Sequence, residues 1–141
     1  MQITEEAAYR LRLATGFLEE ARQDSELKRW RSCVDNSQLA AENAAKAVLA
    51  LVAPVGATHE PAALLRRLLA ENRYPPTVQS KVERVAECAA RLGWSVHVGT
   101  DYGDGIKRRT PWELFGQDDA RQALALAEEA VDAVREITQG S

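Results

Sequence analysis

The fold is decided by an alanine-rich stretch in the first third of the chain, which reads Ala40-Ala41-Glu42-Asn43-Ala44-Ala45-Lys46-Ala47-Val48-Leu49-Ala50-Leu51. Alanine is the best helix former, and its small side chain lets a neighbouring helix approach closely. Apolar residues continue on the same helical face back to Trp30, and Pro54 and Gly56 follow as helix-ending residues. We therefore predict a helix over about residues 30–52 at the centre of the molecule.

The segments around this stretch repeat apolar residues at spacings of three and four, which is typical of amphipathic helices. The pattern predicts further helices over about residues 4–23, 60–71, 77–92 and 118–137. No alternating run of β-branched residues indicates a strand. We therefore predict an all-α fold, an up-and-down bundle of four to five helices in a single domain over residues 1–141.

A long loop is predicted over residues 93–116, before the last helix. It is long for a compact bundle, and loops of that length usually carry function or are disordered. Its several aromatic residues argue against plain disorder. Within it, Thr110-Pro111-Trp112-Glu113 matches a capping box with proline at the first helical position, which predicts a single helical turn there.

The composition limits the classes of function. A formal net charge of −3 excludes a protein that binds nucleic acid through its overall charge. Cys33 and Cys88 each lie in a helical pattern with no second ligand nearby, so we interpret them as core residues rather than a disulfide or zinc site. The acidic N-terminus lacks the apolar segment of a signal peptide, and no apolar stretch is long enough to span a membrane. We expect a cytoplasmic protein with no membrane partner.

Arg91 and His97 are the candidate catalytic residues. Because Gly93 ends a helix between them, the loop would be able to fold His97 back toward Arg91. A neutral imidazole can remove the proton of a ribose 2′-hydroxyl, and a guanidinium can stabilise charge on phosphate, without any metal or cofactor. The alternative is structural: an arginine at a helix end, and a histidine packed against Trp94 or Tyr102.

The other polar features of the chain are weaker signals. Lys107-Arg108-Arg109 and the nearby Tyr102 would suit phosphate binding and base stacking. The same basic run would equally serve as a solvated turn, or as a clamp on the acidic helix start at residues 118–119. Asp101 and Asp104 fit turn chemistry better than a metal site. His59, at the start of a helix, is interpreted as structural. We predict neither a metal nor a cofactor.

Taken together, these segments resemble the HEPN domain family over nearly the whole chain. Residues 36–47 are similar to the family pattern Gln-x-Ala-x-Glu-x-x-x-Lys-Ala. Thr58-His59 with Leu64-Leu65 is similar to its Thr-His segment, and residues 100–104 stand where the family often has Thr-Arg-Tyr-Pro-Asp. Residues 111–113 and 118–127 resemble its final helical segments.

The resemblance implies a helical bundle that forms a homodimer. Many members of the family are metal-independent ribonucleases with an Arg-x(4–6)-His motif, which Arg91 and His97 match in spacing. Several are toxins neutralised by a small nucleotidyltransferase, the MNT antitoxin. The resemblance therefore implies an endoribonuclease that leaves 2′,3′-cyclic phosphate, with His97 as general base, Arg91 as phosphate stabiliser and residues 107–109 positioning RNA.

Three residues depart from the usual family pattern: Leu92, Gly99 and Asp101. They leave open a second hypothesis, a non-catalytic HEPN module that binds a nucleotide or a nucleotidyltransferase partner. A third hypothesis is a purely structural dimer whose loop closes the core. The position of His97, in a cleft shared with Arg91 or in packing, would separate these hypotheses.

Overall fold

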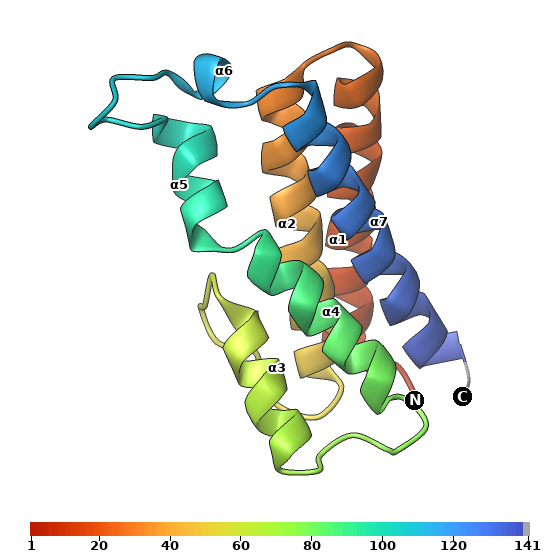
Figure 1. The fold of residues 1–141 in the computed structure, drawn as a ribbon. Coiled ribbons are helices and arrows are strands. Elements are labelled where there is room, and N and C mark those ends of the chain that lie inside the picture. The colour runs from red at the N-terminus through yellow and green to blue at the C-terminus, as the bar shows by residue number, and fades with distance from the viewer. Residues whose placement is uncertain (140–141) are drawn as a thin grey trace.

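The computed structural model describes residues 1–139, which form seven helices (Figure 1). They are α1 (Glu5–Glu26), α2 (Trp30–Ala50), α3 (Pro61–Ala70), α4 (Gln79–Arg91), α5 (Trp94–Tyr102), α6 (Pro111–Leu114) and α7 (Gln117–Gln139). The all-α helical bundle predicted from the sequence is confirmed. No helix of the described residues is long and apolar enough to cross a membrane.

The central position predicted for the alanine-rich helix is confirmed. In α2 every side chain from Ala40 to Ala50 is buried, and α2 packs against each of the other helices. The long helices α1 and α7 lie beside it, and α4 packs alongside α7 and passes in front of α2 (Figure 1). The small side chains of α2 allow the neighbouring helices to pack with their axes close to that of α2.

The ends of the bundle also follow the sequence pattern. Thr4 caps α1 by accepting a hydrogen bond from the Ala7 amide, and Pro61 takes the first position of α3. The first helix, predicted to end near residue 23, continues to Glu26. The terminal amino group of Met1 donates to the carbonyl of Ile137 at 2.6 Å, which ties the start of the chain to α7.

The predicted loop over residues 93–116 is wrong for residues 94–102, which form α5. Its valines, threonine and glycine are poor helix formers, so local preference does not explain the helix. Tertiary contacts do: Thr100 is fully buried, and Gly99 lies so close to Phe115 that an added Cβ would sit 3.1 Å from the ring. The helical turn predicted at Thr110 is confirmed as α6, with both hydrogen bonds of a capping box to Glu113.

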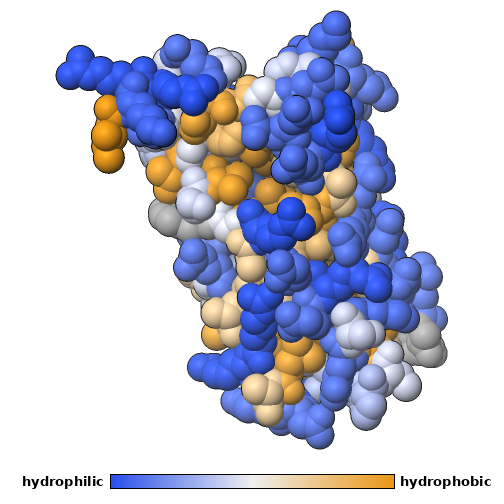
Figure 2. Space-filling model, viewed as in Figure 1, coloured by the Kyte–Doolittle hydropathy of each residue, from blue (hydrophilic) through white to orange (hydrophobic). Residues whose placement is uncertain are grey.

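The distribution of apolar and hydrophilic side chains on the surface follows the packing of the helices. Apolar side chains gather where α5 meets the bundle, while most of the rest of the same face is hydrophilic (Figure 2). Both Cys33 and Cys88 are buried free thiols, as the helical pattern predicts. Because α5 and α6 pack on the start of α2, the segment richest in candidate functional residues is attached to one end of the bundle.

Candidate functional site

Thr100 attaches α5 to the bundle through polar contacts with the first turns of α2. The guanidinium of Arg31 donates from Nη1 to the carbonyl of Thr100 at 2.8 Å. The Thr100 hydroxyl lies 3.2 Å from Oδ1 of Asp35 and 2.8 Å from the carbonyl of His97. Burial raises the pKa of Asp35, although the hydrogen bond from Thr100 opposes that shift. These contacts hold the backbone of α5 in a defined place.

Two histidines meet at the surface that α5 forms with the segment before α3. The rings of His59 and His97 are nearly parallel, with 7° between their planes and 5.9 Å between their centroids. The side chain of His59 is 59% exposed and that of His97 is 26% exposed. Both imidazoles are thus at least partly exposed.

Each imidazole lies beside a carboxylate. Nδ1 of His59 is 3.3 Å from Oε1 of Glu42, and Nε2 of His97 is 3.7 Å from Oδ2 of Asp101. When Nδ1 of His59 donates its proton to Glu42, the lone pair of that ring is on Nε2, which can then act as a base. The carboxylate of Asp101 is close enough to His97 to help position its ring.

Glu42 is itself held by neighbours on α2. Its Oε2 lies 3.4 Å from Nζ of Lys46, and both residues are buried. The side-chain amide of Gln38 approaches Oε1 at 3.5 Å. A buried carboxylate requires such a counter-charge, because the desolvation of an unpaired charge is costly. Lys46 therefore fixes Glu42, and Glu42 in turn orients His59.

Sequence reasoning missed His59, Glu42 and Lys46 as candidate functional residues. A signal was present: Glu42 and Lys46 are charged residues four apart on a helix whose neighbouring positions are apolar. Charges on such a helix must pair when it is buried. The interpretation of His59 as a residue serving the helix start is incomplete, since the backbone amide of Glu60 is bonded by Thr58 while His59 faces Glu42 and His97.

Arg91 and His97 are in different helices. Arg91 is the last residue of α4, and its side chain is exposed, whereas His97 is in α5. Gly93 stands between the two helices as the residue that precedes α5. The ring of His97 stacks on His59 and pairs with Asp101 on its own helix. The structure thus brings His97 together with His59.

The basic run forms the tip of a tight turn. Oδ1 of Asp104 accepts hydrogen bonds from the amides of Ile106 and Lys107, both at 3.1 Å, which is the turn chemistry predicted for this aspartate. Lys107, Arg108 and Arg109 are exposed, as is Tyr102 at 77%. No group of acidic, histidine or cysteine side chains in residues 1–139 is arranged to hold a metal ion.

The basic run does not form the predicted clamp on the start of the last helix. Arg109 donates to the carbonyl of Glu113. At the start of α7, Asp119 accepts from the amide of Gly116 at 2.8 Å, and Asp118 pairs with Arg121. The basic side chains therefore point their charge toward solvent, apart from this one contact of Arg109.

Comparisons with known proteins agree with the geometry of the bundle. The crystal structure of TT1696 from Thermus thermophilus is similar in fold, with a TM-score of 0.71 and 21% sequence identity; the match covers 95% of this chain and 99% of that one. No curated protein matches significantly. The model of the HEPN domain matches residues 7–137. Because this match extends over nearly the whole helical bundle, the chain belongs to the HEPN domain family.

Proposed function

We propose that this HEPN domain is a metal-independent endoribonuclease whose reaction takes place at His59 and His97. One observation carries the proposal: two accessible imidazole rings lie parallel, 5.9 Å apart, and each has a carboxylate at its edge. A general base and a general acid placed side by side are what transesterification of RNA requires. The residue roles differ from those expected from the sequence, where His97 alone was the base.

The proposed step is an in-line attack within one ribonucleotide. Nε2 of His59 takes the proton of the 2′-hydroxyl, and the 2′-oxygen bonds to phosphorus. The bond from phosphorus to the 5′-oxygen breaks, and protonated His97 gives its proton to that oxygen. The products are a 2′,3′-cyclic phosphate and a 5′-hydroxyl, and no metal or redox partner is consumed. Glu42 acts as a positioning residue for His59, and Asp101 for His97.

Cationic residues would hold the phosphates of the substrate. Arg91 and residues 107–109 are exposed, so they are available to bind the phosphates of a strand. In the proposed homodimer, a second copy would add its own set. Sedimentation equilibrium tests the homodimer, and co-purification with a candidate MNT nucleotidyltransferase tests that partner.

Cleavage of a mixed-sequence single-stranded RNA in EDTA tests the proposal. His59→Ala and His97→Ala should each lower the rate at least about 100-fold, the usual contribution of acid–base catalysis. Arg67→Ala, an exposed arginine on α3, serves as the control and should behave like wild type. The wild-type rate should fall on both the acid and the alkaline side of an optimum. An unchanged rate in either histidine variant would exclude the proposed reaction.

A second candidate function is the non-catalytic module. The departures from the usual family pattern at Leu92, Gly99 and Asp101 favour it. It predicts that the wild-type protein binds a nucleotide or a nucleotidyltransferase and leaves RNA intact. Arg91→Ala would then weaken binding, and no cyclic-phosphate product would form with any variant.

A further inference from the structure

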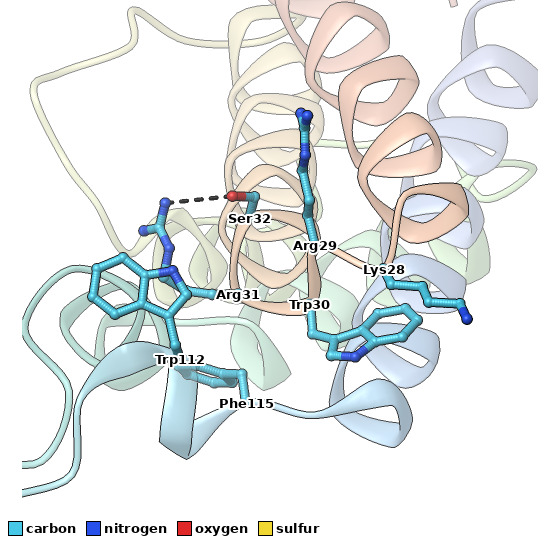
Figure 3. A pocket seen from close by; sticks show the side chains of 7 residues that line it. All are labelled: Lys28, Arg29, Trp30, Arg31, Ser32, Trp112 and Phe115. Carbon is cyan, nitrogen blue, oxygen red and sulfur yellow. Dashed lines mark hydrogen bonds between the residues drawn. The ribbon is translucent and has the colours of Figure 1, made fainter.

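A pocket of about 440 Å³ opens where α6 covers the beginning of α2 (Figure 3). Its lining combines three aromatic side chains with three cations. They are Trp30, Trp112 and Phe115, and Lys28, Arg29 and Arg31. Among the described residues that line it, none is acidic. The pocket therefore suits a ligand that presents both a flat ring and negative charge.

The aromatic side is held ready for stacking. Trp112 is 72% exposed, although it stands on α6, which is fixed by the Thr110 capping box and by the contact of Phe115 with Gly99. The guanidinium of Arg31 lies over the Trp112 ring, 5.6 Å from its centroid. An exposed tryptophan held by its backbone offers a stacking surface at little entropic cost.

The cationic side comes from the segment that leads into α2. Figure 3 shows Arg31 beside Trp112, with Lys28 and Arg29 extending outward from the same short segment. Lys28 and Arg29 are exposed. Cations around the rim of an aromatic pocket place phosphate oxygens at the edge while a base occupies the interior.

The pocket is connected to the histidine pair through α5. Arg31 donates to the carbonyl of Thr100, and the Thr100 hydroxyl lies 2.8 Å from the carbonyl of His97. Thr100 follows His97 by three helical residues, which is about 4.5 Å along the axis. A strand that passes over the histidines can therefore continue toward the pocket.

We propose that this pocket binds one unpaired nucleotide of the RNA strand, with its base against Trp112 and its phosphate near Arg29. The proposal rests on the proposed function and deepens it, because it assigns single-stranded RNA as the substrate and gives the strand a second fixed point away from the cleaved bond. Double-stranded RNA cannot present a base in this way.

Fluorescence anisotropy with a labelled, uncleavable 2′-O-methyl 12-mer tests the proposal. Trp112→Ala should weaken binding about tenfold, and Trp112→Phe should retain most of the affinity because it keeps a ring. Arg29→Ala should weaken binding and lower its dependence on salt. The controls are Tyr9→Ala, an exposed aromatic on α1, and Arg67→Ala on α3; both should bind as wild type does. Equal affinity of Trp112→Ala and wild type would overturn the proposal.

Two further probes identify the source of the ligand. A duplex of the same length should bind more weakly than the single strand, and so should AMP. If AMP binds as tightly as the 12-mer, the pocket is a site for a free nucleotide and the proposal fails. The 12-mer is not cleaved, so its binding can be measured independently of ribonuclease activity. If binding depends on Trp112 but the protein cleaves no RNA, the proposal for the pocket is retained and the proposed ribonuclease function is rejected.

Discussion

Cys88 lies on the buried face of α4, and its thiol is shielded from water. Burial, together with the nearby carboxylate of Glu129, raises the pKa of this thiol to about 12. Burial likewise raises the pKa of Cys33. Since the thiolate is the reactive form, neither residue should react with a disulfide reagent at pH 8 in the native protein. Both should react in denaturant, and fast labelling of the native protein would contradict this prediction.

Asp35 gives the molecule a pH-dependent stability. Because burial raises its pKa in the native state, the folded protein binds this proton more tightly than the unfolded chain does. Its contribution to stability is therefore present in acid and is lost as the pH rises through the native pKa. Asp35→Asn keeps an oxygen for Thr100 and removes the charge, so urea denaturation should show wild type losing stability relative to the variant between pH 4 and pH 7. Asp118→Asn, an exposed control, should show no such trend.

The connection between α5 and α6 depends on Gly103. Its φ of 71° is in the left-handed region, and an added Cβ would lie 2.2 Å from the carbonyl oxygen of Arg109. Gly103→Ala should therefore lower the free energy of unfolding by about 1–3 kcal/mol. Gly105→Ala in the same segment meets open space and should change it by less than about 0.5 kcal/mol. Equal effects of the two substitutions in urea denaturation would contradict this account of the turn.

The whole bundle depends on close packing around α2. Ala45 is fully buried on this helix, which touches every other helix, so a larger side chain there must push elements apart. Ala45→Leu should cost about 1–3 kcal/mol in thermal or urea unfolding. Ala125→Leu, on the exposed side of α7, should have little effect. A stability loss of the same size at both positions would mean that packing on α2 is not the cause.

The periodic helices could be predicted because their information is local. Alanine content around residues 40–51, the spacing of apolar residues and the Thr110 capping box each indicate helix without reference to distant residues. α5 could not be predicted in this way. Its residues favour other conformations, and the burial of Thr100 and the contact of Gly99 with Phe115 exist only once α2 and α6 are in place.

Likewise, only part of the candidate site could be predicted from the sequence. The order of residues is enough to predict the helical bundle and its central helix. It is the packing of the helices that sets His97 opposite His59, 38 positions earlier in the chain, and Trp112 against Arg31. The physical reason is that helical periodicity is a property of neighbouring residues, whereas such pairings depend on how distant segments pack, and a single sequence does not display that packing.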